Sequence, residues 1–521
     1  MNASRAVVET GCGFLSWPDD ALFPRISSRR VSEGAAMPVQ SVESNRTLIG
    51  GQWVGSEDRL DVFDPADVRT PIARIPALTV DDVRAAYEAA ERGFAGWKAT
   101  SPFERAKVLI RAATLLRERA GGIAADITAE NGKTRAEATG EVGKAADFLD
   151  YFAGIARAGY GTLLHDARPG TRAGFQREPI GVVLAITPWN DPLITPARKL
   201  APALAAGNAA VFKPATETPL SGLHFARALH DAGLPAGVLN VITGRTAQLA
   251  DALLDDPRIA AVTFTGSNAV GEALRARVAA RNVRFQGELG GKNASVVLAD
   301  ADLEYAAATV VAAAFGQAGQ RCTATSRVLV ERAVHDRFAA LLRERVAALR
   351  VGPGSAPDTV VGPLTSPGHR DGVLAAIDRA VAQGARIDVG GTVPAGGEFA
   401  HGCYVVPTLL TEVTAEMAVW REEVFGPVLV LRPVDDLDQA IAAVNDSDFG
   451  LAAAVFTTGL AAAHRFLDEV ETGQVAVNTT TPGWDVHMPF GGFRDSGSPF
   501  KEQGEEALRF YTRVKTFAIH F

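Results

Sequence analysis

One of the three cysteines in this 521-residue chain stands in a setting that favours reactivity. Cys322 follows a run of small residues and has the polar neighbours Gln320, Arg321 and Thr323. An adjacent guanidinium favours the thiolate, which is the nucleophilic form of cysteine. A lone cysteine is more often a core residue, but this polar setting predicts a reactive one. Cys403, in HGCYVVPT, is predicted to be an inert residue of a strand.

Two further residues could assist such a nucleophile. Glu288 lies just before Gly290-Gly291, and because glycine leaves the backbone free, the carboxylate could approach a water molecule and then withdraw. That movement suits a general base, although a solvated loop glutamate is an equal alternative. Asn190 lies between two prolines in ITPWNDP. Its amide could donate to a developing oxyanion, or the residue could simply form a turn.

Residues that follow predicted strands could bind a nucleotide. Lys213 ends the run VFK, and at the carboxyl end of a parallel strand it could contact a ribose or a phosphate, or it could remain solvated. Gly266 and Ser267 occupy a strand-to-helix turn whose N–H groups could meet a pyrophosphate. The segment is neither a GxGxxG nor a Walker motif, so each signal is weak by itself.

Other chemistries find little support in the sequence. The nine histidines lie singly, with no ligand spacing for a metal, and no GxSxG elbow indicates a serine hydrolase. A formal net charge of -8 argues against binding to nucleic acids or anionic membranes. Apolar runs fall far short of the roughly 20 residues that a membrane span needs. With few cysteines for disulfides, we expect a soluble, cytoplasmic enzyme.

The elements that would position these residues alternate between helices and strands. The spacing of apolar residues predicts helices within 79–119 and over 134–156. Strands are predicted at 181–187, 208–214, 238–244 and 259–267, with helices between them at 197–207, 219–233 and 246–254. This alternation predicts an α/β fold with a parallel sheet covered on both faces.

The second half of the chain repeats this alternation from a new origin. It begins with strands at 293–300 and 327–332 and helices at 303–318 and 334–349. The break at Gly290-Gly291 is therefore the predicted domain boundary. The alternating run at the end of 504–521 predicts an edge strand that seeks a partner in this chain or in another subunit.

The N-terminal segment differs from the rest. Residues 1–40 show no apolar period and no signal-peptide core. We predict that they form a disordered tail without function, or that translation starts at Met37.

Seven short motifs, each weak alone, become specific through their common order. They are PWN (188–190), KPATETP (213–219), FTGS (264–267), ELGGKN (288–293), GQRC (319–322), EEVFGPV (422–428) and PFGG (489–492). Together they resemble the aldehyde dehydrogenase superfamily, from about Leu48 to the C-terminus.

The resemblance implies a particular fold and division of the chain. The family has a Rossmann-type dinucleotide-binding domain, an α/β catalytic domain and a β-arm used for oligomerisation. The resemblance places these parts, after a disordered tail at 1–47, as follows: NAD(P) binding at 48–157 and 179–288, catalysis at 289–485, and the arm with the C-terminal tail at 158–178 and 486–521.

The resemblance also implies a reaction. Cys322 would attack the aldehyde carbon, and the Asn190 amide with the Cys322 N–H would hold the oxyanion. After hydride transfer to the nicotinamide, Glu288 would activate water to hydrolyse the thioester. CoA-dependent acylating members generally lack this base. Glu502 matches a second proton-handling carboxylate of some members.

Cofactor contacts follow from the same motifs. Lys213 would bind the adenosine ribose, and Glu423 with Phe425 would hold the nicotinamide ribose. The full implied set is Ile186, Thr187, Pro188, Trp189, Lys213, Thr216, Gly266, Ser267, Leu289, Glu423 and Phe425. Many NAD-specific members have Glu at the position of Thr216, where its charge repels a 2′-phosphate. We therefore predict that NADP+ is accepted or preferred, with no metal.

The residues expected around the substrate are unusual. Asp191 and Arg198 stand where the family commonly has aromatic residues, and Arg321 precedes the nucleophile. Two arginines near the pocket, which Phe490 completes, predict a substrate with a carboxylate or another anion. Alternatively, Arg198 is a surface cation that pairs with Asp191.

The segments GQRCTATSR and EQGEEALRFYTRVKT are most similar to 2-oxoglutarate semialdehyde (2,5-dioxopentanoate) dehydrogenases, and then to succinate semialdehyde dehydrogenases. The leading hypothesis is an NAD(P)+-dependent semialdehyde dehydrogenase that forms homodimers or homotetramers, since the arm would otherwise expose an edge. One alternative is a dehydrogenase of hydrophobic or aromatic aldehydes. Another is a non-catalytic protein that retains the scaffold.

Overall fold

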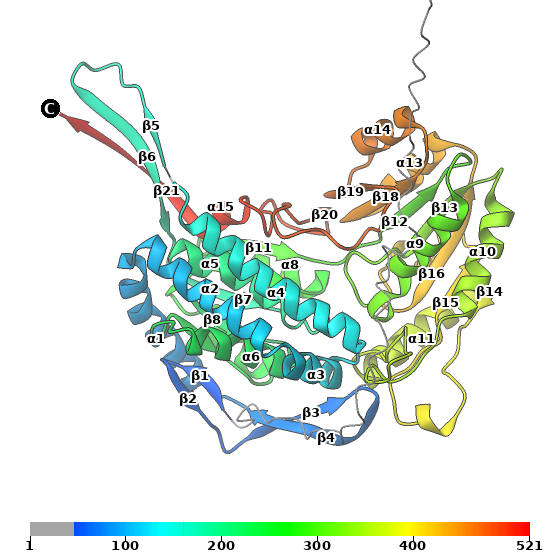
Figure 1. Ribbon diagram of the computed structural model, residues 1–521, viewed down its shortest axis with the longest axis horizontal. Coiled ribbons are helices and arrows are strands. Elements are labelled where there is room, and N and C mark those ends of the chain that lie inside the picture. The colour runs from blue at the N-terminus through cyan, green and yellow to red at the C-terminus, as the bar shows by residue number, and fades with distance from the viewer. Residues whose placement is uncertain (1–45, 160) are drawn as a thin grey trace, which may run out of the picture. The chain divides into compact units, whose positions relative to one another are not determined.

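Two sheets of mainly parallel strands organise the chain (Figure 1). The computed structural model describes residues 46–159 and 161–521, so the predictions for residues 1–45 lie outside the described residues. The first sheet has the order β11-β10-β7-β8-β9, and every pair in it is parallel. Its strands are β7 (Val182–Ile186), β8 (Ala209–Lys213), β9 (Leu239–Val241), β10 (Ile259–Thr265) and β11 (Arg284–Glu288).

The second sheet has the order β14-β15-β16-β13-β12-β18-β19, in which only β14 and β15 pair antiparallel. Its strands are β12 (Ala294–Val297), β13 (Arg327–Glu331), β14 (Arg386–Val389), β15 (Thr408–Thr411), β16 (Val428–Val434), β18 (Ala452–Phe456) and β19 (Gln474–Val477). The chain passes from the first sheet to the second between Glu288 and Ala294. The glycine pair that suggested a boundary lies within this passage.

Helices accompany both sheets. Those of the first half are α1 (Val80–Ala99), α2 (Pro102–Glu118), α3 (Ala120–Asn131), α4 (Arg135–Ala156), α5 (Ile194–Ala206), α6 (Pro219–Asp231), α7 (Thr246–Leu254) and α8 (Asn268–Ala279). Those of the second half are α9 (Leu303–Phe315), α10 (His335–Ala347), α11 (Pro367–Ala382), α12 (Ala418–Arg421), α13 (Leu437–Asn445), α14 (Leu460–Glu469) and α15 (Ala507–Tyr511), with short 3-10 turns η1 (Gly316–Gly319) and η2 (Gly397–Phe399).

Two local differences from the sequence prediction have clear causes. Helix α3 was not expected, because Gly121 and Gly122 in its first turn weaken the helical pattern; Gly132 ends it with φ 92°. The helix predicted over 303–318 ends at Phe315, where the chain turns toward Cys322.

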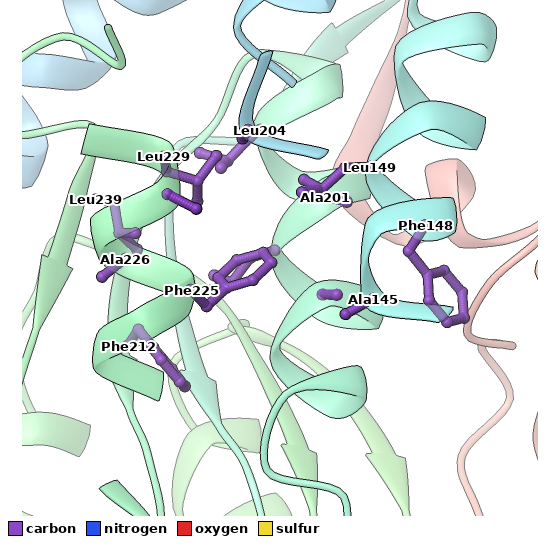
Figure 2. Packing of buried hydrophobic residues seen from close by; sticks show 14 of the residues in the cluster. Ala145, Phe148, Leu149, Ala201, Leu204, Phe212, Phe225, Ala226, Leu229 and Leu239 are labelled. Atoms are coloured by element: carbon purple, nitrogen blue, oxygen red, sulfur yellow. The ribbon is translucent and has the colours of Figure 1, made fainter. Parts of the chain in front are cut away.

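The core beneath the first sheet fixes the position of α5. Eleven of the 13 residues of this helix are buried, and Figure 2 shows it packed between α4 and α6. Side chains of this cluster include Ala145, Phe148, Leu149, Ala201, Leu204, Phe212, Phe225, Ala226, Leu229 and Leu239. Burying a Leu or Phe side chain contributes about 1.5–3 kcal/mol. Helix α5 is therefore a firm support for the polar side chains that it carries.

The remaining strands form small antiparallel sheets. Strands β5 (Gly161–Leu164), β6 (Thr171–Pro179) and β21 (Thr512–His520) form one with the order β21-β6-β5, which extends as an arm (Figure 1). The others are β1 (Thr47–Ile49) with β2 (Gln52–Val54), β3 (Arg59–Asp64) with β4 (Asp67–Pro76), and β17 (Phe449–Gly450) with β20 (Phe493–Arg494). In the part of the chain that the structure describes, no helix has the length and apolarity to cross a membrane.

Candidate active site

A cavity of about 240 Å³ lies where the carboxyl ends of β7 and β10 meet the loop that carries Cys322. It brings together residues from several of the predicted motifs. Its lining consists of Pro188, Trp189, Asn190, Asp191, Thr195, Arg198, Thr265, Gly266, Ser267, Leu289, Gly290, Cys322, His369, Glu423 and Phe425. The parallel strands explain this convergence, because their carboxyl ends lie at one edge of the sheet.

An unusual loop conformation presents Cys322 to the cavity. Left-handed φ values occur in succession at Gln317 (51°), Ala318 (54°) and Gly319 (69°). Such values cost about 1–3 kcal/mol for a residue other than glycine, so surrounding contacts must hold them. The Gln317 N–H donates to Oε1 of Glu137 at 2.7 Å. Nδ2 of Asn293 donates to the carbonyl of Cys322 at 2.7 Å.

The electrostatics at Cys322 differ from the sequence prediction. Burial raises the pKa of the thiol to about 12, and the largest opposing influence is the guanidinium of Arg198. The prediction that Arg321 favours the thiolate is therefore wrong for this state. Arg321 instead directs its Nε to Gln317 and lines a small neighbouring cavity. Cys403 is buried, but it lies in an irregular loop and not in the predicted strand.

Asn190 is buried in the loop after β7, and its side-chain amide is hydrogen-bonded to the loop that carries Cys322. Nδ2 donates to the carbonyl of Gln320 at 3.0 Å. The preceding carbonyl, of Trp189, accepts from Nδ2 of Asn131 at 2.8 Å. One N–H of the Asn190 amide is thus bonded to the carbonyl of Gln320, two positions before Cys322, and this bond holds the amide beside the loop that carries Cys322.

Glu288 ends β11 and is 2% exposed. Its Oε1 accepts from Nε2 of Gln286 at 3.1 Å, and its Oε2 has no hydrogen-bond partner. Burial, and then the carboxylate of Glu502, raises its pKa well above the usual range. The side chain lies outside the lining of the 240 Å³ cavity, so a base at this position must move to reach a substrate bound to Cys322.

Glu502 is joined to a buried lysine that the sequence did not indicate. Nζ of Lys199 bonds to Oε1 of Glu502, to Oγ1 of Thr263 at 3.0 Å and to Oε1 of Gln286 at 3.3 Å. Burial lowers the pKa of Lys199. Because Gln286 also contacts Glu288, these polar groups form a continuous chain between the two carboxylates.

Arg198 lies on α5 beside this chain, with its side chain 14% exposed. Its guanidinium is 4.6 Å from the ring centroid of Phe490, and Nη1 is 3.7 Å from Oε2 of Glu502. Nε has no hydrogen-bond partner. Arg198 is not the surface cation paired with Asp191 of the alternative prediction, because its side chain is 14% exposed and its ion pair is with Glu502. Oδ1 of Asp191 accepts from Gln317 at 2.9 Å and from Lys133 at 3.3 Å.

An aromatic wall closes another side of the cavity. Trp189 and Phe425 meet edge to face, with their centroids 5.4 Å apart, and Phe425 has φ 56°. His369, which the sequence did not indicate, contacts both rings, and its Nε2 lies 2.8 Å from the carbonyl of Phe425. Glu423 accepts from the N–H of Gly291 at 2.9 Å, and burial raises its pKa to about 7.

The remaining predicted cofactor residues lie along the same strand ends. Ile186 and Lys213 are register partners, and Nζ of Lys213 donates to the carbonyl of Pro214 at 2.7 Å. Thr216 lines a separate cavity of about 400 Å³. The hydroxyls of Thr187 and Thr265 are buried without partners. Since buried polar groups normally have partners, these two hydroxyls fit a polar ligand such as a dinucleotide. Within 46–159 and 161–521, no cluster of three or more His, Cys, Asp or Glu could hold a metal ion.

A cysteine, a buried carboxylate and a fixed amide, held at the edges of two mainly parallel sheets, are groups that covalent catalysis uses. The chain matches the aldehyde dehydrogenase family over residues 53–517. It is 42% identical over 477 residues to the alpha-ketoglutarate semialdehyde dehydrogenase of Haloferax volcanii, covering 91% of this chain and 98% of that protein. It is 40% identical over 473 residues to the 2,5-dioxopentanoate dehydrogenase of Saccharolobus solfataricus, covering 90% and 98%.

Solved structures agree with this match. The betaine aldehyde dehydrogenase of Staphylococcus aureus, in complex with NAD+, superimposes with a TM-score of 0.89 at 33% identity, covering 91% of this chain and 94% of that one. The chain belongs to the aldehyde dehydrogenase family, and it is an oxidoreductase that acts on an aldehyde group. The predicted family, fold and reaction class are confirmed, and the non-catalytic alternative is not favoured.

Proposed function

We propose that the enzyme oxidises an aldehyde that carries a carboxylate, with 2,5-dioxopentanoate as the leading candidate, to the corresponding acid. The observation that carries this proposal is the position of Arg198. Its guanidinium lines the cavity that contains Cys322 and leaves Nε without a partner, so it could bind the distal carboxylate of a short semialdehyde. Two relatives at 42% and 40% identity, which are named for this substrate, support the choice.

Cys322 is the nucleophile in this proposal. The thiol loses its proton to water in the cavity as its sulfur bonds to the aldehyde carbon, and collapse of the resulting oxyanion breaks the C–H bond and leaves a thioester. The second N–H of the Asn190 amide and the backbone N–H of Cys322 stabilise the oxyanion. A bound nicotinamide supplies the hydride acceptor. Glu288 then turns toward the cavity and removes a proton from the water that hydrolyses the thioester.

Glu502 handles the proton that Glu288 collects. The polar chain through Gln286 and Lys199 supports this role, because it joins the two carboxylates inside the protein. The low pKa of Lys199, caused by burial, favours an amine that can exchange protons.

The cofactor is NAD+ or NADP+. Lys213 binds the adenosine ribose, Gly266 and Ser267 approach the pyrophosphate, and Glu423 with Phe425 holds the nicotinamide ribose. The other contacts are Ile186, Thr187, Pro188, Trp189, Thr216 and Leu289. We assign cofactor binding to 48–157 and 179–288, catalysis to 289–485, and the arm to 158–178 with 486–521.

The proposed assembly is a homodimer or homotetramer in the cytoplasm. In the described sheet β21-β6-β5, strand β21 has a neighbour on one side only, and a second copy could cover its free edge. The low cysteine content, three in 521 residues, favours a reducing compartment. Light scattering on the purified full chain tests the assembly; a monomer at all concentrations contradicts it.

The reaction is tested by following the absorbance of the reduced cofactor with a panel of aldehydes. We expect Cys322→Ser to abolish turnover, and Glu288→Gln to release one equivalent of reduced cofactor and then stop. If Glu288→Gln turns over at the wild-type rate, the base is misassigned. If the wild type oxidises no aldehyde with either cofactor, the proposed function fails.

The substrate class is tested with matched aldehydes. We expect the wild type to prefer 2,5-dioxopentanoate and succinate semialdehyde over butanal and benzaldehyde. Arg198→Met should lower kcat/KM for the anionic aldehydes by about 100-fold, the scale of one charge-assisted pair, and leave butanal nearly unchanged. A wild-type preference for benzaldehyde would support the hydrophobic alternative.

Cofactor choice depends on Thr216 in this proposal. Thr216→Glu adds a negative charge near the expected 2′-position, so it should raise the NAD+/NADP+ ratio of kcat/KM by at least about tenfold. Thr216→Gln, which adds bulk without charge, is the matched control. An unchanged ratio in Thr216→Glu would show that this side chain does not face the ribose.

A further inference from the structure

Behind the loop that carries Asn190 lies a lysine that neither the sequence motifs nor the proposed reaction uses. Lys133 connects α3 to α4, between Gly132, which ends α3, and Thr134, which caps α4 with Glu137. Its side chain is 1% exposed. A buried ammonium is costly unless its donors are satisfied, so its contacts indicate its purpose.

All three donors of Lys133 have acceptors. Nζ donates to the carbonyl of Asn190 at 2.8 Å, to Oε2 of Glu141 at 2.5 Å and to Oδ1 of Asp191 at 3.3 Å. An ammonium group has three N–H donors. The group is therefore saturated, and two of its three partners are the consecutive residues Asn190 and Asp191.

Glu141 holds the next part of the same loop. Its Oε1 accepts from the N–H groups of Leu193 at 2.8 Å and Ile194 at 3.1 Å. Helix α5 begins here without a side-chain cap of its own, and the first N–H groups of a helix need acceptors from elsewhere. Lys133 and Glu141 together fix the backbone from Asn190 to the first turn of α5.

The same two residues, Asn190 and Asp191, are also hydrogen-bonded to the loop that carries Cys322. Oδ1 of Asp191 also accepts from Nε2 of Gln317 at 2.9 Å, and Nδ2 of Asn190 donates to the carbonyl of Gln320 at 3.0 Å. Lys133 thus lies where the loop of Asn190 is joined to the loop of Cys322.

The charge of Lys133 is stable in this setting. Burial would lower its pKa, but Glu141 and Asp191 outweigh burial and raise it. Lys133 also satisfies Asp191, which lines the cavity beside Arg198. The ion pair of Arg198 is with Glu502.

We propose that Lys133 is a positioning residue for the oxidation: by holding the Asn190 carbonyl and the Asp191 carboxylate, it aims the Asn190 amide at the oxyanion that forms on Cys322. This proposal rests on the proposed role of Asn190. Lys133 itself touches no reacting atom. A displacement of a catalytic group by about 1 Å lowers a rate by about 100-fold, so loss of Lys133 should slow formation of the acyl-enzyme.

The test uses Lys133→Met/Glu141→Gln in the full chain. Removing both charges avoids an unpaired charge on Glu141, and Asp191 keeps its hydrogen bond from Gln317 at 2.9 Å. The Glu141→Gln change keeps an amide oxygen as the acceptor that α5 needs, so the variant should fold. Lys144→Met is the control, because Lys144 lies on the same helix α4 but pairs with Asp485 at the surface. Stopped-flow measurement with succinate semialdehyde and NAD+ gives the burst of reduced cofactor.

We expect the burst rate of the double variant to fall by about 100-fold. The Kd of the reduced cofactor, measured by fluorescence, should change less than about twofold, and the control variant should match the wild type. A purely structural role would lower the melting temperature and weaken cofactor binding together. A folded double variant with a wild-type burst rate overturns the proposal.

Asn190→Ala separates failure of this inference from failure of the proposed function. If Asn190→Ala keeps the wild-type burst rate, the assignment of Asn190 fails. If Asn190→Ala slows the burst and Lys133→Met/Glu141→Gln does not, only the positioning role fails. If Asn190→Ala and Lys133→Met/Glu141→Gln both act through the Asn190 amide, the variant that combines them should have a burst rate close to that of Asn190→Ala alone, because effects on one group are not additive.

Discussion

Two buried lysine–carboxylate pairs lie at helix α5, one at its start and one on the helix itself, and they differ in how completely their hydrogen bonds are satisfied. Lys133–Glu141 lies at the start of the helix, and Lys199–Glu502 lies along it; all four side chains are at most 2% exposed. Both oxygens of Glu141 accept hydrogen bonds. Oε2 of Glu502 has no hydrogen-bond partner, and neither has Oε2 of Glu288.

The surroundings shift the pKa values of the two lysines in opposite directions. Burial lowers the pKa of both, but Glu141 and Asp191 outweigh burial and raise the pKa of Lys133. For Lys199, burial prevails over Glu502, and the neighbouring Arg198 acts in the same direction as burial. In the proposed reaction the first pair holds the backbone as a fixed charge and the second exchanges protons. The two pairs are alike in residue type and burial, and they differ in the number of carboxylate oxygens without a hydrogen-bond partner.

The largest expected effect comes from removing one member of the saturated pair. Lys133→Met leaves Glu141 and Asp191 without their cation, and breaking a buried pair in this way costs about 3–5 kcal/mol. Urea denaturation of the full chain should show this loss. Lys133→Met/Glu141→Gln should recover more than half of it, because both charges of the pair are gone. Equal losses in the two variants would show that the unpaired carboxylate is not the cause.

The unsaturated pair is tested through activity. In Lys199→Met, the polar chain between Glu288 and Glu502 is broken, and loss of one proton-handling group lowers a rate by at least about 100-fold. Because Cys322 and Asn190 are untouched, the burst of reduced cofactor should persist while steady-state turnover falls. Stopped-flow and steady-state measurements on one preparation check this. A parallel fall in both rates would place Lys199 with Lys133, as a positioning group.

Sequence patterns predicted which residues lie at the carboxyl ends of the strands. Lys213 ends a strand of one parallel sheet, and Asn190 and Gly266 follow strands of the same sheet. Such ends share one edge, so their convergence could be inferred without a structure. The alternating pattern at the C-terminus likewise predicted β21.

Contacts between distant segments were not foreseeable in this way. Lys199 and Glu502 are 303 positions apart, and Lys133 and Asn190 are 57 apart; no local period marks either pair. The thiol shows the same limit. The sequence neighbour Arg321 suggested a thiolate, whereas burial and the distant Arg198 set the pKa of Cys322 in the folded chain.

The smallest expected effect concerns the charge balance at Glu288. Burial and Glu502 raise the pKa of this carboxyl, while Lys199, Lys501 and Arg198 lower it. Lys501 takes no part in the hydrogen bonds that join Glu288 to Glu502. Its Nζ donates to the carbonyl of Gly491, and the backbone of Gly491 lies against Oε1 of Glu288. It is therefore the cation that can be removed with least damage to the polar chain.

Lys501→Met should raise the pKa of Glu288, since one of the opposing cations is lost. A general base acts in its ionised form, so turnover rises with pH through that pKa, and the acid limb of the kcat profile should move to higher pH. Lys501→Arg keeps the charge and should keep the wild-type limb. An acid limb that stays in place in Lys501→Met would mean that the limb does not belong to Glu288, and the contrast between the two pairs would then rest on the wrong titrating group.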